Sequence, residues 1–285
     1  MVKNKKVSGY GQGGVDVVMS VDQVAKEAAA ISAAAPKSKE LEKLSKNEPL
    51  LSIKNLKAGY GKMEILHDFN LFISKGQSLC LIGPNGAGKS TVLHSIFGFT
   101  NIFSGNITIR GKDITNLTPN QKLSNAGIAY ILQDKSVFPQ MTVEENLLMG
   151  GFLKNKPSEA KEATEIVFDK YERLAARRNK PAGVLSGGER RLLEISRALV
   201  MQPQILLVDE PSIGLEPRFI DMVFGILDDL QKKDGKTIIM VEQNAKKGLA
   251  FADIGYVLVS GETAIAETGD KVLSNPDVGR LFLGG

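Results

Sequence analysis

Cysteine is almost absent from this sequence, which has 285 residues and a single cysteine, Cys80. One thiol cannot form an internal disulfide, and protein disulfides are rare in reducing compartments. Long apolar runs are missing as well, so no stretch is predicted to cross a membrane. We therefore expect a reducing, cytoplasmic environment. If the protein works at a membrane, another chain supplies the membrane-spanning part.

The most apolar stretch near the N-terminus, residues 15–35, contains Asp16, Asp22, Lys26 and Glu27. Each charge would cost about 2.5–3.5 kcal/mol near the centre of a membrane, which outweighs the gain from the valines and alanines. The stretch also lacks the continuous apolar part and the clear cleavage site of a signal peptide. It is predicted to be neither a membrane span nor a signal peptide.

Neither sign of charge dominates, because 36 Lys and Arg residues face 32 Asp and Glu residues, for a net charge of +4. Such a mild excess suits an anionic ligand or a membrane surface, but a plain solvated surface is the simpler interpretation. Apolar residues make up 42% and charged residues 24% of the chain, as in ordinary globular proteins. The length allows one large domain or two small ones.

The chain divides near residue 49. Residues 1–49 combine the glycine-rich "GYGQGG", the helix-favouring "VDQVAKEAAAISAAAP" and the charged "KSKELEKLSKN". They predict a flexible, partly helical extension in preference to a docking element. Residues 50–285 form the second unit, in which short strand-like runs alternate with helical patterns.

Four runs of this second unit are continuously apolar: "SLCLIG", "GIAYIL", "ILLVDE" and "TIIMVE". Short runs of this kind are typical of parallel strands buried on both faces. Two others, "LSIKNLK" and "LHDFNLFI", alternate like half-buried strands. The pattern predicts an α/β fold with a mainly parallel core sheet, whose sites lie at the carboxyl ends of the strands.

A helical pattern interrupts the sheet between about residues 142 and 183 and predicts a small helical subdomain. It begins with a capping box formed by Thr142 and Glu145. Near the end of the chain, "DIGYVLVSGETAIAET" predicts a hairpin that turns at Gly261 and Glu262.

The segment "GPNGAGKS" fits the phosphate-loop pattern G-x-x-x-x-G-K-[ST], and it lies between a strand-like and a helical run as that motif requires. Its glycines let several N–H groups point at one anion, and the following helix adds its positive end. Lys89 would reach the β- and γ-phosphates, and Ser90 would bind Mg²⁺. The predicted nucleoside triphosphate site consists of Gly83, Pro84, Asn85, Gly86, Ala87, Gly88, Lys89, Ser90 and Thr91.

The run "ILLVDEP" delivers two carboxylates to the same edge of the predicted sheet. Asp209 would hold Mg²⁺, directly or through water. Glu210 would accept a proton from the attacking water. Adjacent carboxylates that merely end a strand would repel each other, so we expect a functional pair.

The stretch "LSGGER" combines a capping box, Ser186 with Glu189, and two glycines in the first turn of an amphipathic helix. Gly187 and Gly188 weaken a helix, so capping alone does not explain them. They would allow a ligand to approach the backbone at a helix N-terminus.

The order of phosphate loop, "LSGGER" and "ILLVDEP" closely resembles the ATP-binding subunits of ABC transporters from Leu51 to Gly285. The resemblance implies a P-loop NTPase fold with an antiparallel β subdomain. It also implies a dimer of ATPase domains in which each "LSGGER" segment (Ser186, Gly187, Gly188, Glu189) caps ATP held by the partner.

The same resemblance implies roles for two further residues. Tyr60 would stack on adenine, a contact worth about 1 kcal/mol. Gln133 would touch Mg²⁺ and the attacking water. "PSIGLEP" resembles the loop that crosses the dimer interface, although Glu216 replaces the aspartate of many relatives.

"VFPQMTVEENLLMGG", "DEPSIGLEP", "VEQNAKKGLAFADIGYVL" and "LFLGG" together resemble the second ATP-binding subunit of branched-chain amino acid uptake systems. This implies two transmembrane permeases, a second homologous ATPase, an extracytoplasmic solute-binding protein that acts indirectly, and peripheral attachment at the cytoplasmic face of the membrane. A heterodimer is expected, with a homodimer as the alternative. Soluble ABC ATPases that act in translation or repair usually have two ATPase units or a long inserted arm. This sequence has one phosphate loop and no such arm, so we expect no nucleic-acid partner.

Many ATPases of this family have a histidine at the so-called switch position, and the segment "VEQN" with its following helix assigns Gln243 to that position here. The two histidines of the sequence, His67 and His94, lie too far away in the sequence to take its place. Glutamine can hydrogen-bond a γ-phosphate or water but cannot shuttle a proton. Two interpretations follow. In the first, Gln243 senses the γ-phosphate by hydrogen bonding while Glu210 acts as the base, and this is the one we favour. In the second, this half-site hydrolyses ATP slowly and the partner ATPase carries out most of the hydrolysis. A lipopolysaccharide-export ATPase and a non-hydrolysing ATP clamp are the alternative functions.

Overall fold

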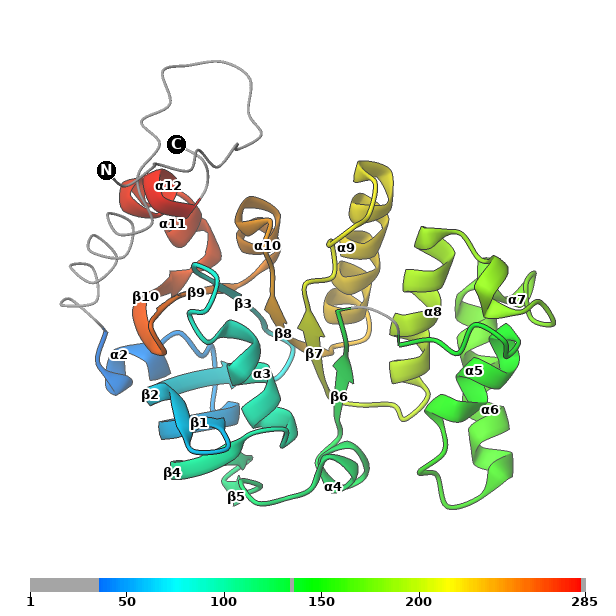
Figure 1. Cartoon of the computed structure of the whole chain (residues 1–285), viewed down its shortest axis with the longest axis horizontal. Coiled ribbons are helices and arrows are strands. Elements are labelled where there is room, and N and C mark those ends of the chain that lie inside the picture. Colours follow the sequence, from blue (N-terminus) through cyan, green and yellow to red (C-terminus); the bar gives the residue numbers. More distant parts are fainter. Residues whose placement is uncertain (1–35, 134–135, 283–285) are drawn as a thin grey trace, which may run out of the picture.

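The structure is a computed structural model that describes residues 36–133 and 136–282. The helix-favouring run predicted before Pro36 lies outside the described residues. Two sheets and a separate group of helices make up the described chain (Figure 1).

The larger sheet has the order β10-β9-β3-β8-β7-β6. Its middle strands are parallel, and β10 pairs with β9 in the antiparallel sense. The four continuously apolar runs are β3, β6, β7 and β8, which confirms them as neighbouring strands of a buried parallel sheet. The bounds are β3 (Ser78–Ile82), β6 (Ile128–Ile131), β7 (Ile205–Asp209), β8 (Thr237–Val241), β9 (Ile254–Val259) and β10 (Glu262–Thr268).

The hairpin between β9 and β10 is present, but its turn lies one residue earlier than predicted. Ser260 and Gly261 both have positive φ, at 48° and 82°, as the favoured two-residue hairpin turns require. Glu262 is already the first residue of β10.

Side chains of the large sheet alternate between two cores, because successive residues of a strand face opposite sides. Leu79 and Leu81 of β3 face the first core, whereas Cys80 and Ile82 face the second. The first core is closed by α3 (Lys89–Phe97) and by an antiparallel sheet of order β2-β1-β4-β5. Helix α3 lies between the two sheets (Figure 1). The strands of the smaller sheet are β1 (Pro49–Tyr60), β2 (Met63–Ser74), β4 (Asn101–Ile109) and β5 (Lys112–Asp113).

The second core is covered by helices that follow β7, β8 and β10 in the chain. Leu227 and Leu230 of one helix and Leu249 of the next pack there and are almost fully buried. The covering helices are α9 (Pro217–Lys232), α10 (Ala245–Phe251), α11 (Gly269–Leu273) and α12 (Pro276–Phe282).

A helical unit with its own core lies beside the sheets (Figure 1). The capping boxes at Thr142 and Ser186 form as the sequence predicts. Leu192 and Leu193 of α8 pack into this core, so α8 belongs with the helices of the 142–183 segment. The unit contains α5 (Val143–Gly150), α6 (Pro157–Lys170), α7 (Glu172–Ala175), a 3-10 turn (Ala182–Val184) and α8 (Gly187–Leu199).

Residues 37–48 contact the sheets although the sequence places them in the extension. Leu41 of α2 (Ser38–Glu42) is buried in the first core, and Lys46 forms an ion pair of 2.7 Å with Asp253. The remaining short helix, α4 (Pro119–Ser124), precedes β6. Among the helices described, none combines the length and the apolar character that crossing a membrane requires.

Candidate functional site

Three adjacent strands, β3, β8 and β7, end at the same edge of the large sheet and carry the predicted site. The phosphate loop follows β3, Glu242 and Gln243 follow β8, and Asp209 and Glu210 end β7. The register aligns Leu81 with Val241 and Val241 with Asp209. Strand order therefore brings together segments that lie far apart in the sequence.

The phosphate loop adopts a conformation that only glycine tolerates at its first residue. Gly83 has φ 146°, and a Cβ there would lie 2.2 Å from the carbonyl oxygen of Leu258. Lys89 begins α3, and its Nζ donates to the carbonyl oxygens of Gly83 and Pro84 at 2.9 and 3.0 Å. Burial lowers the pKa of Lys89, while the charges of Glu210 and Asp209 act in the opposite direction. Of the other predicted residues, Ala87 and Thr91 are buried, and Asn85 and Gly86 are exposed at the loop.

Asp209 is held by two hydroxyl groups. The Ser90 Oγ donates to Oδ1 at 3.2 Å, and the Tyr130 hydroxyl donates to Oδ2 at 2.8 Å. Ser90 and Asp209 thus present oxygen atoms to one point, and hard oxygen ligands are those that Mg²⁺ prefers. Burial and the neighbouring Asp209 charge strongly raise the pKa of the Tyr130 hydroxyl, which therefore remains a donor.

Glu210 has the backbone strain and the raised pKa that are common at functional sites. Its φ is 44°, in the left-handed region that side chains other than glycine rarely adopt. Burial raises the pKa of its carboxyl group, the Asp209 charge adds to this, and Lys89 opposes it. Gln133 Nε2 donates to Glu210 Oε2 at 2.8 Å, so the amide and the candidate base are in contact.

Tyr60 lies at the end of β1 and is 43% exposed. Its hydroxyl is 2.5 Å from His94 Nδ1, and the two rings meet edge to face. His94 also packs against Phe99 and Tyr130. Tyr60, the residue predicted to stack on adenine, is therefore held by His94. His94 in turn packs against Tyr130, whose hydroxyl donates to Asp209.

Two neighbouring residues at the end of β8 have opposite environments. Gln243 is exposed, as a residue that meets a nucleotide must be, whereas Glu242 beside it is only 1% exposed. Glu242 accepts from the Ser212 hydroxyl and from the backbone N–H groups of Ser212 and Asn244. Sequence reasoning missed Glu242, Tyr130 and His94; an acid that directly follows a buried strand was the only available signal.

The predicted cap residues lie on α8, away from the phosphate loop, with β6 between α8 and α3 in Figure 1. Glu189 closes the capping box with Ser186 and also contacts Arg177. A Cβ on Gly188 would lie 2.3 Å from Phe219 of α9, whereas one on Gly187 would have only Leu215 nearby, at 3.9 Å. Gly188 therefore has a packing reason that the sequence did not reveal, and Gly187 alone leaves its backbone open to a ligand.

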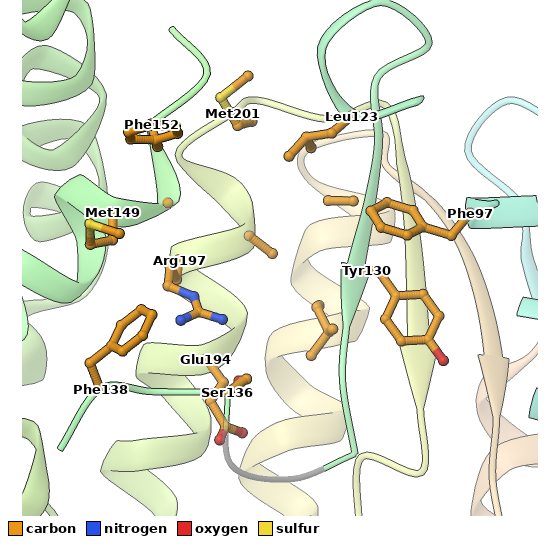
Figure 2. Close-up of a pocket in the computed structure, with 14 residues that line it drawn as sticks. Phe97, Leu123, Tyr130, Ser136, Phe138, Met149, Phe152, Glu194, Arg197 and Met201 are labelled. Atoms are coloured by element: carbon orange, nitrogen blue, oxygen red, sulfur yellow. The ribbon is translucent and has the colours of Figure 1, made fainter. Parts of the chain in front are cut away.

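A groove of about 350 Å³ lies between the large sheet and the helical unit. Figure 2 shows Phe97 and Tyr130 on one side, facing Phe138, Met149 and Arg197. Phe138, Met149 and Phe152 are 45%, 42% and 78% exposed, an unusual grouping of large apolar side chains on a surface. The groove is therefore suited to an apolar segment of another protein.

The sequence of this chain is similar to known proteins over most of its length. The profile of the family described as "ABC transporter" matches residues 66–213. The "High-affinity branched-chain amino acid transport ATP-binding protein BraG" of Pseudomonas aeruginosa is 40% identical over 83% of this chain and 100% of that protein. The "Probable branched-chain amino acid transport ATP-binding protein LivF" of Archaeoglobus fulgidus is 37% identical over 82% and 99%. The "Lipopolysaccharide export system ATP-binding protein LptB" of Haemophilus influenzae is 30% identical over 82% and 97%.

A crystal structure of a nucleotide-free ATP-binding cassette from an ABC transporter superposes with a TM-score of 0.73 and 28% identity. It covers 83% of this chain and 100% of that one. The similarity in sequence and in fold to ATP-binding proteins agrees with the way the phosphate loop and the two carboxylates are arranged in this structure. The chain belongs to the ABC transporter family, as one of its ATP-binding, ATP-hydrolysing subunits.

Proposed function

We propose that this subunit hydrolyses ATP to drive an ABC importer for branched-chain amino acids. The observation that carries the hydrolytic part is the contact between Gln133 and Glu210 beside the Ser90–Asp209 pair. The solute class is supported by the two relatives of 40% and 37% identity, both named for branched-chain amino acid transport. The lipopolysaccharide-export relative is 30% identical, which supports that alternative less.

The site residues divide the work according to their chemistry. The phosphate-loop N–H groups and Lys89 would bind the phosphates, and Ser90, Asp209 and Gln133 would hold Mg²⁺, which supplies electrostatic stabilisation of the transferred phosphoryl group. Glu210 would accept the proton of the attacking water, and its raised pKa brings it closer to neutral pH, where a general base is most effective. Tyr60 would stack on adenine.

Gln243 would sense the γ-phosphate by hydrogen bonding while Glu210 supplies the base. Its exposure at the end of β8 and the buried support of its neighbour Glu242 favour this role over a slow half-site. The non-hydrolysing clamp is less well supported, because the strained, raised-pKa Glu210 is arranged as a base.

The apolar groove would receive a cytoplasmic segment of a permease. Two observations support this occupant: the groove exposes Phe138, Met149 and Phe152, and the relatives are transport subunits. Two permeases and a second homologous ATPase would complete the assembly, with a solute-binding protein on the other side of the membrane. In this proposed assembly the subunit would be bound peripherally at the cytoplasmic face of the membrane. Ser186, Gly187, Gly188 and Glu189 would cap the partner ATPase's nucleotide.

The experiment that tests this function is gentle purification of the chain from native membranes, with identification of co-purifying proteins by mass spectrometry. Two permeases and a different ATPase are expected. Recovery of this ATPase alone with exporter-type membrane proteins would contradict the importer and favour a homodimer. Phosphate release by the purified assembly, measured over time, separates hydrolysis from a clamp.

A further inference from the structure

Glu242 is a buried carboxylate to which none of the hydrolytic roles described above is assigned. It is 1% exposed and directly follows β8, the strand between the phosphate-loop strand β3 and the carboxylate strand β7. A buried charge is costly unless it is well hydrogen-bonded. The residue therefore needs a structural or functional reason.

The contacts of Glu242 join two loops. Its Oε1 accepts from the Ser212 hydroxyl and from the Asn244 N–H, both at 2.7 Å, and its Oε2 accepts from the Ser212 N–H at 3.3 Å. Ser212 belongs to the loop 211–216 that follows Glu210, and Asn244 follows Gln243. All three donors are neutral groups, and both carboxyl oxygens of Glu242 act as acceptors.

The surrounding chain is shaped to admit this side chain. Gly248 of α10 faces its stem, and a Cβ on Gly248 would lie 3.0 Å from the Glu242 Cβ and 2.6 Å from the Cys80 sulfur. Asn244 in turn caps α10 by accepting from the Lys247 N–H at 3.2 Å. Helix α10, the loop 211–216 and the end of β8 therefore converge on one carboxylate.

Glu242 is itself excluded as the base that activates water. Its side chain is almost fully buried, and its oxygens are already engaged by three donors. Gln243, the next residue, is exposed at the site, and the Glu210 N–H donates to the Val241 carbonyl at 2.9 Å. Glu242 thus lies between the backbone that carries the candidate base and the backbone that carries the candidate γ-phosphate sensor.

We propose that Glu242 is a positioning residue for ATP hydrolysis, which fixes Gln243 and the loop 211–216 relative to Asp209 and Glu210 through its bonds to Asn244 and Ser212. Misplacing reacting groups by about 1 Å can cost up to about 100-fold in rate. The phosphate loop is held by other contacts, so Glu242 acts on turnover and not on the affinity for ADP, which has no γ-phosphate to meet Gln243.

The test compares kcat, KM and ADP affinity for the wild type, Glu242→Gln, Ser212→Ala and the double variant. In Glu242→Gln one carboxylate oxygen becomes an NH₂ group, which meets a donor N–H of Ser212 or Asn244. We expect kcat to fall between about 10-fold and 100-fold, with ADP affinity within twofold of the wild type and any change of KM smaller than the fall in kcat. The double variant should be no slower than the slower single variant, because both changes break the same connection.

Asp253→Asn is the matched control for a general loss of stability. Asp253 accepts from Lys46, Ser78 and Gln231 at the opposite end of β3, away from the nucleotide edge. Its variant should lower the melting temperature and leave kcat unchanged. Should Glu242→Gln fail to fold, Ser212→Ala carries the test together with Ser212→Thr, which keeps the hydroxyl and should restore turnover.

Unchanged kcat in Glu242→Gln, multiplicative effects in the double variant, or an equal loss of kcat in Asp253→Asn would overturn the proposal. Lack of hydrolysis by the wild type would instead contradict the proposed function and would be visible in the same assay.

Discussion

Glu210 combines a left-handed backbone with a raised carboxyl pKa, and its partner Gln133 comes from a different strand end. Neither feature stabilises a fold, since the first costs conformational energy and the second reflects a charge that is poorly solvated. Their coincidence in one side chain is the strongest indication, at the scale of single residues, that this group acts on substrate.

Glu210→Gln is expected to lower ATP hydrolysis by about 10²–10⁴-fold, because the amide cannot accept the proton of the attacking water. Nucleotide binding should persist, since Lys89 and the phosphate loop are unchanged. Phosphate release and ADP affinity, measured on the same preparation, check both statements. An undiminished rate would remove Glu210 from the mechanism.

Gln243→Ala is expected to reduce turnover strongly, because alanine has neither the donors nor the acceptor that would meet γ-phosphate and water. Gln140→Ala, a change of an exposed glutamine in the turn before α5, is the control and should have little effect. Equal rates for the two variants would instead favour a site whose turnover depends on the partner ATPase.

The sequence predicts the phosphate loop and the Asp209–Glu210 pair because each follows a buried strand and has its own spacing pattern. Tyr130 could not be predicted, since its position in "GIAYIL" is indistinguishable from a core aromatic residue. Only the strand order shows that its hydroxyl reaches Asp209. Glu242 was missed for a related reason: two of its three donors belong to Ser212, in a loop about 30 residues away in the sequence.

Helices and strands were predicted where a local pattern was strong. The parallel strands and the two capping boxes were found in this way, whereas β4, β5 and α4 were not. β4 contains Ser104, Gly105 and Asn106, which disfavour strands, and it exists because it pairs with β1. The β9–β10 turn was misplaced by one residue because Ser260 unexpectedly adopts a positive φ.

Packing between α8 and α9 gives opposite expectations for the two glycines of the capping segment. Gly188→Ala should destabilise the protein by about 1–3 kcal/mol, because its Cβ would displace the ring of Phe219. Gly187→Ala has room and should leave the melting temperature unchanged or raise it. ATP-dependent association with the partner ATPase should nevertheless fall in Gly187→Ala; if it does not, the cap is formed elsewhere.

Lys122 of α4 joins this helix to the end of α3, since its fully buried Nζ donates to the Ser95 carbonyl at 3.2 Å. Burial lowers its pKa to about 8, from an ordinary value of 10.5. Between these pH values the unfolded chain binds one more proton at this site than the folded chain does, so stability should rise with pH. Denaturant unfolding of wild type and Lys122→Met at pH 7.5 and 10 should show a larger rise in the wild type, and equal rises would contradict this role of Lys122.

At the scale of the whole molecule, the helical unit and the sheets have separate cores and meet along the apolar groove. A partner segment bound in the groove would contact both the large sheet and the helical unit, because residues of both line it. The proposed permease segment would cover the large apolar side chains that are exposed there.

Phe152→Asp should weaken co-purification of the permeases, because Phe152 is 78% exposed at the groove and a charge there opposes an apolar segment. Hydrolysis by the isolated subunit should not change. Ile166→Asp, at a 51% exposed residue of α6 outside the groove, is the matched control. Equal recovery of permeases with both variants would place their contact on another surface.

The position of β8 between β3 and β7 has a consequence for what substitutions can alter. Neighbouring strands are about 4.8 Å apart, a spacing set by backbone hydrogen bonds. The lateral dimensions of the reaction centre are therefore independent of the side chains that occupy it. A substitution at residue 243 should therefore change the groups offered to a bound nucleotide and leave the spacing between the phosphate loop and the carboxylates as it is.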